Sequence, residues 1–197
     1  MARALSQGSY LVEAMKILFQ QGLINPRGGN GSVRISDNEI LITPSGLPKY
    51  MLTPSDLVRY NIIDGTYIGP YRPSIETMVH ARIYKIRNDA QAVLHAHPPL
   101  TVALVDSGFV GWWETQLVET EFSVGQVYVA KPAPPGTPEL ASNVGECVEK
   151  GAKIVIVPKH GVFAWDTTVW GALDAIIALE YTAKYFIVTK IIEKLKS

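Results

Sequence analysis

The sequence predicts a single α/β domain spanning residues 1–197, and three observations support this class. Segments with apolar residues at helical spacing alternate with short apolar runs bounded by turn residues, which is typical of interleaved helices and strands. The chain has 197 residues, enough for one sizeable core. Its residues are 47% hydrophobic and 18% charged, as in ordinary globular proteins.

Charge and cysteine content narrow the functional classes. The 18 Lys and Arg residues balance the 18 Asp and Glu residues, so no broad nucleic-acid footprint is predicted and any anionic partner must be recognised locally. The lone Cys147 excludes an internal disulfide framework and a cysteine-based zinc module. The sequence contains no signal-like or membrane-length apolar run, and we expect a cytoplasmic protein.

In the first half of the chain, a helix is predicted over about residues 6–21, ending at Gly22. Two short strands should follow at 33–35 and 40–42, and two more at 57–62 and 66–68. The segment Pro73-Ser74-Ile75-Glu76 opens a second helix, with Ser74 as its expected N-cap.

In the second half, a buried strand at 92–94 leads to two histidines and then to a helix at about 99–106. Residues 112–124 show no clear period. Further strands are predicted at 127–130, 153–157 and 162–165, with a helix reaching 148 before the second of them. The last 28 or so residues form one long helix whose expected inner face is Ala175, Leu179, Thr182, Ala183 and Phe186.

The stretch Leu94-His95-Ala96-His97-Pro98 carries the strongest chemical signal. Residues two apart on a strand point to the same face, so His95 and His97 should project together. With His160, at the end of another buried strand, they form a cysteine-free set typical of an open catalytic metal site. Nitrogen and oxygen donors favour Zn²⁺, with iron, cobalt or manganese as alternatives. The alternative reading is a pair of ordinary polar residues at a strand exit.

An acid–base candidate and a fourth histidine lie on the helix that follows Ser74. A glutamate such as Glu76, in the first turn of a helix, is stabilised by the helix dipole, and that alone would account for most such residues. Beside three histidines, however, Glu76 could ligate the metal or move a proton at the carbon next to a polarised carbonyl. His80, four residues later, is better explained as a buried histidine with satisfied hydrogen bonds than as a ligand.

Two glycine-rich loops and one serine suggest a phosphate site. The segments 28–32 and 43–46 offer backbone N–H groups, an amide and hydroxyls, and Ser74 adds a hydroxyl at a helix N-terminus. Each loop alone is more often just a turn. Together they predict a cradle for a phosphate group.

The ordered motifs Gly-Asn-Gly-Ser, Thr-Pro-Ser-Gly, Pro-Ser-Ile-Glu, His-Ala-His, Pro-Gly-Thr and Lys-His-Gly resemble the class II sugar-phosphate aldolase family over about residues 8–188. This family includes L-fuculose-1-phosphate aldolase, which the motifs resemble most, L-ribulose-5-phosphate 4-epimerase and methylthioribulose-1-phosphate dehydratase. The resemblance implies a three-layer α/β/α fold around a largely antiparallel sheet, and a homotetramer with sites between subunits. It further implies that metal is bound by His95, His97, His160 and Glu76, that Glu76 is the acid/base, and that phosphate is bound by Gly29, Asn30, Thr43, Ser45, Gly46 and Ser74.

The resemblance leads to an expected reaction, with alternatives. We expect zinc-dependent, reversible cleavage of a ketose 1-phosphate to dihydroxyacetone phosphate and an aldehyde. A dehydratase or 4-epimerase is the alternative within the family, and a non-catalytic assembly domain like that of adducin is a remote one. Two departures matter: Ile75 stands where the aldolase usually has a second serine, and residues 116–119 contain no tyrosine to protonate the aldehyde oxygen. Trp112, Trp113 and Tyr128 are candidates for a subunit interface.

Overall fold

The computed structural model describes residues 2–114 and 117–196. Its helices are α1 (Ala2–Gln20), α2 (Thr77–Ile86), α3 (Pro99–Asp106), α4 (Val118–Ser123), α5 (Pro138–Glu149) and α6 (Val169–Leu195), with 3₁₀ turns η1 (Lys49–Met51), η2 (Pro54–Asp56) and η3 (Trp112–Glu114). Its strands are β1 (Asn30–Arg34), β2 (Glu39–Ile42), β3 (Val58–Asn61), β4 (Tyr67–Ile68), β5 (Ala92–Ala96), β6 (Val127–Val129), β7 (Ile154–Val157) and β8 (Gly161–Asp166).

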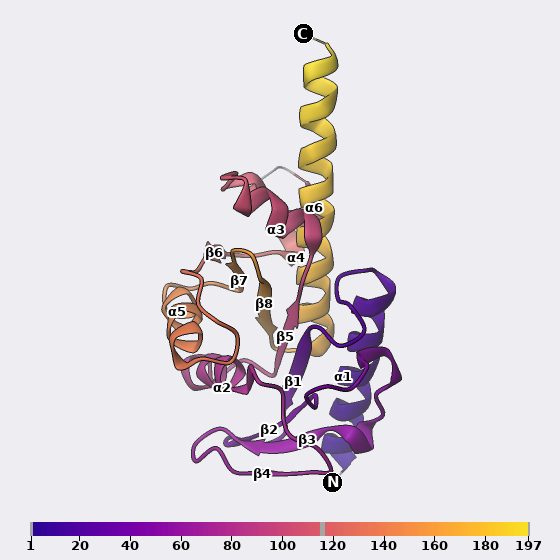
Figure 1. Ribbon diagram of the computed structural model, residues 1–197, viewed down its shortest axis with the longest axis vertical. Helices are drawn as coiled ribbons and strands as arrows, with labels where there is room; N and C mark the ends of the chain where they lie inside the picture. Colours follow the sequence, from indigo (N-terminus) through magenta and orange to yellow (C-terminus); the bar gives the residue numbers. More distant parts are fainter. Residues whose placement is uncertain (1, 115–116, 197) are drawn as a thin grey trace.

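One mixed sheet organises the described residues (Figure 1). Its strand order is β4-β3-β2-β1-β5-β8-β7-β6, and every neighbouring pair is antiparallel except β6 and β7. The predicted α/β class with a largely antiparallel sheet is therefore confirmed. The central strands β5, β7 and β8 are buried on both faces, which explains why they read as nearly continuous apolar runs.

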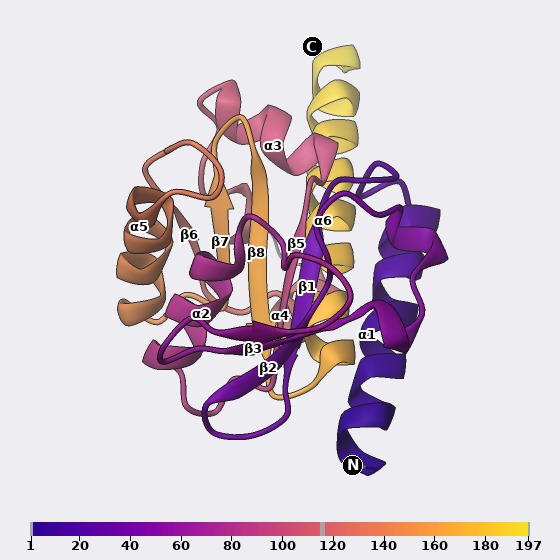
Figure 2. The same ribbon diagram turned by 60° about the horizontal axis from the view of Figure 1, so that its bottom comes forward.

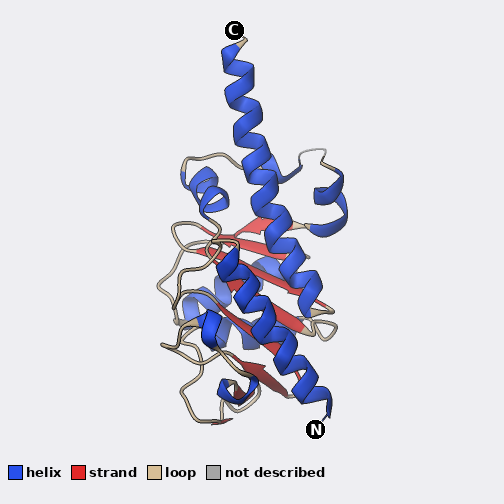
Figure 3. Ribbon diagram, turned by 90° about the vertical axis from the view of Figure 1, so that its right-hand side faces the viewer, coloured by secondary structure: helices blue, strands red, loops and turns tan. Residues whose placement is uncertain are grey.

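Helices cover both faces of the sheet and give two separate cores. Alternate residues of β5 show the division: Leu94 packs in the core beneath α1, α3 and α6, whereas Val93 packs in the core beneath α2 and α5. Figure 2 shows α2 and α5 on the near side of the sheet, and Figure 3 shows α1 and α6 across the opposite face. No helix of the described residues is long and apolar enough to cross a membrane.

Helix α6 extends beyond the rest of the molecule, and the C-terminus lies at its free end (Figure 1). Its predicted inner face is confirmed for Ala175, Leu179, Thr182 and Ala183, which are buried, and Phe186 packs against the same core. After Ala183, α6 carries exposed apolar and aromatic side chains, among them Tyr185, Val188, Ile192 and Leu195.

Two sequence-based expectations differ from the structure, and the structure explains one segment that the sequence left unassigned. The second helix begins at Thr77 rather than at Ser74, because residues 74–76 form a turn in which the Ser74 carbonyl accepts the N–H and hydroxyl of Thr77. The aperiodic segment contains η3 and α4, whose shortness explains the missing period. Trp112 is 3% exposed and belongs to the core, so it is not available at a surface as expected, while Trp113 and Tyr128 are only partly buried.

Candidate metal and acid–base site

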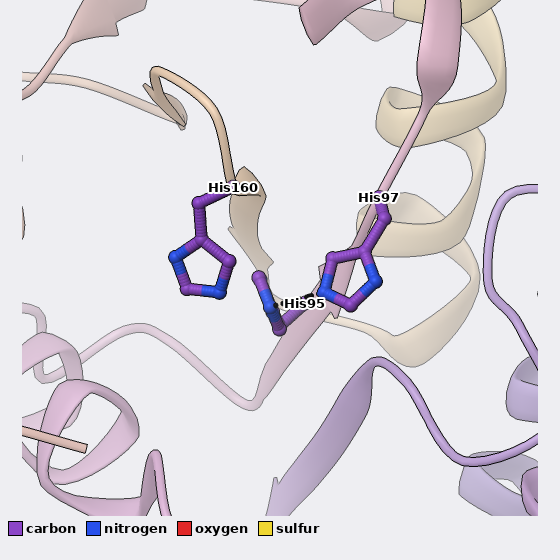
Figure 4. A group of neighbouring side chains, drawn as sticks. All are labelled: His95, His97 and His160. Carbon is purple, nitrogen blue, oxygen red and sulfur yellow. Dashed lines mark hydrogen bonds between the residues drawn. The ribbon is translucent and has the colours of Figure 1, made fainter. Parts of the chain in front are cut away.

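The three predicted histidines converge at one end of the central strands (Figure 4). His95 lies in β5 and faces Phe163 of β8 in the antiparallel register, and His160 immediately precedes β8. His97 follows β5, with its N–H donated to the carbonyl of Leu23. One ligand nitrogen from each histidine lies within 4.8 Å of the others, so the side chains predicted from strand alternation do meet.

Gly161 allows β5 and β8 to approach each other closely at this point. A Cβ atom at Gly161 would lie 2.3 Å from the carbonyl oxygen of Ala96 and 2.7 Å from the His97 ring. The left-handed residue of the turn is instead Lys159, with φ of 58°, and its N–H donates to Asp106 at the end of α3. The glycine therefore allows the close packing of the histidines.

The hydrogen bonding of His95 determines which of its nitrogens can bind a ligand. Its Nδ1 lies 2.9 Å from the carbonyl oxygen of Val162, which can only accept a hydrogen bond, so Nδ1 carries the proton. Burial lowers the pKa of His95 to about 3, so the ring is neutral and its Nε2 presents a lone pair. This backbone contact is the usual way in which a ligand histidine is oriented.

Glu76 lies at the N-cap of α2 and faces two of the histidines. Its Oε2 is 3.1 Å from His95 Nε2, and its Oε1 is 3.2 Å from His160 Nε2. Asn30 donates its side-chain amide to Oε2 at 2.7 Å. Burial raises the pKa of Glu76, whereas positive charge at His95 and His160 and the Asn30 hydrogen bond lower it to about 2, so the group is a carboxylate when a cation, a proton or a metal ion, lies among the histidines.

The donor set fits a divalent cation. The bare lone pair of His95 Nε2 faces the Glu76 carboxylate oxygen at 3.1 Å, an arrangement that repels unless a cation lies between these atoms. His97 Nε2 lies 2.9 Å from the same His95 nitrogen. Ligands about 2.1 Å from one tetrahedral ion are about 3.4 Å apart, close to these separations. Among the described residues, Glu76 Oε1 is also buried without a hydrogen-bond partner.

The predicted phosphate residues divide into two groups. Gly29, Asn30, Ser45, Gly46 and Ser74 line a pocket of about 350 Å³ together with Glu76, His97 and His160. Thr43 lies behind that pocket: its hydroxyl accepts the N–H of Gly31 and its carbonyl accepts the N–H of Ser74, so it joins the loops without reaching the cavity. The side chain of Asn30 is hydrogen-bonded to both Glu76 and His80.

Lys49 is a pocket residue that the motifs did not reveal. Its side chain is 2% exposed, and its ammonium group donates to the carbonyls of Leu47, Pro44 and Arg27. No carboxylate in the described part of the chain forms an ion pair with it, and burial lowers its pKa to about 8. Lys49 thus joins the two glycine-rich loops and places an uncompensated positive charge beside the pocket.

Fold and site together define a metal-dependent lyase. Residues 9–187 match the family described as Class II Aldolase and Adducin N-terminal domain, so the chain belongs to this family and is one of its lyase-type enzymes. The Methylococcus capsulatus methylthioribulose-1-phosphate dehydratase is 30% identical over 89% of this chain and 90% of its own. The Haemophilus influenzae 3-oxo-tetronate 4-phosphate decarboxylase is 28% identical over 92% and 87%.

Solved structures agree with this membership. The L-fuculose-1-phosphate aldolase of Thermus thermophilus superposes with a TM-score of 0.79 at 27% identity, covering 98% of this chain and 97% of that one. Membership in a lyase family, together with the complete set of His95, His97, His160 and Glu76, disfavours the non-catalytic alternative.

Proposed function

We propose that the chain is a zinc-dependent aldolase that reversibly cleaves a ketose 1-phosphate to dihydroxyacetone phosphate and an aldehyde. The observation that carries the proposal is the position of Glu76, whose carboxylate lies between His95 Nε2 and His160 Nε2 on the wall of the same pocket as the phosphate loops. Relatives named for phosphorylated sugars and sugar acids support a substrate of this class.

We assign the metal to His95, His97 and His160, with Glu76 as a ligand of the resting ion. Zn²⁺ bound there would act as a Lewis acid for the carbonyl and hydroxyl oxygens of the substrate. The orientation of His95 by Val162 and the tight approach at Gly161 prepare this ligand set without a substrate.

Glu76 is assigned to the proton at the carbon that bears the developing negative charge. When the carbon–carbon bond breaks, the substrate hydroxyl that becomes the aldehyde oxygen releases its proton, and the electron pair of the bond stays with the dihydroxyacetone phosphate fragment. The Glu76 carboxylate takes up one proton and passes it to that carbon, so the proton count balances. The reverse direction begins with removal of that proton by the carboxylate. The short distance from Glu76 to the histidines keeps this carboxylate beside the carbonyl that the metal would bind.

The phosphate is assigned to the cradle of Gly29, Asn30, Thr43, Ser45, Gly46 and Ser74. Thr43 contributes indirectly, by tying the loops together, and Asn30 through its backbone. Ser74 lies beside Glu76, and the Ser74 hydroxyl accepts a hydrogen bond from the Glu76 N–H at 3.3 Å. A phosphate bound at Ser74 would therefore lie near the acid–base group. The buried charge of Lys49 adds a favourable field for a dianion.

A dehydratase is the second candidate, because the Methylococcus relative named for that reaction matches this chain along almost its whole length. The two reactions, and the decarboxylation named for the Haemophilus relative, differ in what leaves the substrate. The test is product analysis with zinc-loaded enzyme and a panel of ketose 1-phosphates and 3-oxo acid phosphates. Release of dihydroxyacetone phosphate and aldehyde supports the aldolase, whereas loss of water or of carbon dioxide with no aldehyde formed would replace it.

We further propose a homotetramer with sites at subunit boundaries. The described residues that line the pocket include no tyrosine that could protonate the aldehyde oxygen. The stretch 116–119 also contains no tyrosine, and its first residue, Gln116, lies outside the described residues. Exposed aromatic residues on α6 give a surface for a second copy. Mass measurement in solution and mixing of two inactive variants test this: a fully active monomer, or no recovery of activity after proven subunit exchange, would refute a shared site.

A further inference from the structure

A line of buried hydrogen bonds runs from Glu76 away from the pocket and into the core beneath α2. Glu76 Oε2 accepts from the Asn30 amide at 2.7 Å, and Asn30 Oδ1 lies 2.6 Å from His80 Nε2. His80 Nδ1 lies 2.7 Å from Ser32 Oγ, which is 3.0 Å from the Tyr84 hydroxyl. His80 and Ser32 are fully buried and Asn30 is 4% exposed, so water does not compete along this line.

The chemistry of each partner fixes the direction of these bonds. A carboxylate can only accept, so the Asn30 amide turns its NH₂ toward Glu76 and its carbonyl oxygen toward His80. That oxygen also can only accept, so His80 carries its proton on Nε2. Burial lowers the pKa of His80 to about 4, so the ring is neutral and Nδ1 accepts from the Ser32 hydroxyl. The Tyr84 hydroxyl donates to the Ser32 carbonyl at 3.0 Å.

This directionality matters because an asparagine amide is nearly symmetric in shape. Turned by 180°, Asn30 would present its carbonyl oxygen to the Glu76 carboxylate and lose the donor that holds Oε2. A donor on the far side of Asn30 adds to the preference that the carboxylate itself imposes, and His80 Nε2 is that donor. The pairing of β1 with β5 and β2 holds the backbone of Asn30 and Ser32 in place. The side-chain torsions of Asn30 are therefore what its hydrogen-bond partners must fix.

We propose that His80 is a positioning residue, which fixes the amide orientation of Asn30 and through it the carboxylate plane of Glu76. The proposal rests on the proposed function of Glu76. It extends that function by assigning a role to a histidine that neither faces the pocket nor belongs to the three-histidine cluster.

The test compares His80→Leu, which removes the donor, with His80→Gln, which keeps an N–H in reach of Asn30. In metal-loaded enzyme, His80→Leu should lower kcat by about 10- to 100-fold, the usual cost of losing such a supporting contact, with KM little changed. His80→Gln should restore most of the loss. In an Asn30→Ala background, the same His80 change should alter kcat by less than about twofold, because its effect passes through Asn30. Equal loss in both His80 variants, or an undiminished effect without Asn30, would overturn the proposal.

Two further measurements keep the test decisive. If His80→Leu does not fold, Ser32→Ala replaces it: this variant leaves His80 free to move its proton to Nδ1 and should lower kcat in the same direction, with wild-type kcat counting against the proposal. In metal-free wild-type protein, ¹⁵N NMR should show the His80 proton on Nε2, with that signal shifted by Asn30→Ala. A proton on His80 Nδ1 would refute the proposed role of His80, whether or not the chain proves to be an aldolase.

Discussion

At the scale of single residues, Glu76 is the group on which the proposed chemistry depends. It faces two histidine nitrogens and one amide N–H, and positive charge at those nitrogens together with the amide hydrogen bond holds its pKa at about 2 despite burial. A carboxylate held in this way is charged and oriented before any substrate arrives, so it can accept a proton without first losing one of its own.

Glu76→Gln keeps the shape of the side chain and removes its basicity. We expect exchange of the proton at the carbon beside the substrate carbonyl to fall by about 10²- to 10⁴-fold, the usual contribution of a general acid–base group. Metal affinity should also fall, since an amide is a weaker ligand than a carboxylate. Exchange can be followed by NMR in deuterated solvent with dihydroxyacetone phosphate alone. Wild-type exchange rates in fully metal-loaded Glu76→Gln would contradict the assignment.

Lys49 is the second residue with a testable role. Its three donors are already used by backbone carbonyls, so it acts on a phosphate through its charge and by holding the two loops. Lys49→Met should raise KM for a phosphorylated substrate and the inhibition constant for inorganic phosphate by about tenfold, with kcat much less affected.

Lys85→Met provides the matched control for Lys49→Met, because Lys85 lies in the last turn of α2 and does not line the pocket. Equal KM values for the Lys49 variant and the wild-type enzyme would show that this charge does not contribute to phosphate binding.

At the scale of elements, α3 connects two histidine-bearing segments. It begins directly after His97 and Pro98, and its first N–H groups, at Leu100 and Thr101, donate to the Glu180 carboxylate of α6 at 2.9 Å. At its other end, Asp106 accepts the N–H of Lys159, next to His160. The position of α3 on α6 thus helps to set the distance between His97 and His160.

Glu180→Ala should therefore lower both stability and metal affinity. Removing a carboxylate that caps a helix from outside leaves two N–H groups and a hydroxyl without their acceptor, which costs about 1–2 kcal/mol in the free energy of unfolding. Glu193→Ala, which removes an exposed carboxylate on the same helix, should change that free energy by less than about 0.5 kcal/mol. Equal urea midpoints for the two variants would contradict this role of Glu180.

The way in which strands and loops meet explains which parts of the site could be predicted from the sequence and which could not. The pairing of His95 with His97 followed from strand alternation, which is local, and Glu76 from the start of a helix. The partners of Asn30 and Lys49 could not be found in this way, because they depend on the register of β1 against β5 and on the meeting of two loops. Gly161 was noticed in the sequence, but its role as a close-approach residue requires knowledge of where the Ala96 carbonyl lies.

At the scale of the whole molecule, buried histidines link stability to pH. His80 has a pKa of about 4 in the folded chain, against an ordinary value of about 6.5 when unfolded. Between these values the unfolded chain binds more protons, so stability is lost as the pH falls from about 6.5 toward 4. The free energy of unfolding of the metal-free protein, measured in urea, should fall over this window, and less steeply in His80→Gln. Identical pH slopes for both proteins would contradict the burial argument.

The metal content of the purified protein tests the central claim most directly. Elemental analysis of wild-type chain, dialysed and reloaded with Zn²⁺, should find one ion per chain. His95→Ala should lose it while the circular dichroism spectrum of the fold persists, because the change removes one of the three proposed histidine ligands, the one within β5. Full occupancy by a divalent metal in a His95→Ala, His97→Ala double variant would contradict the account.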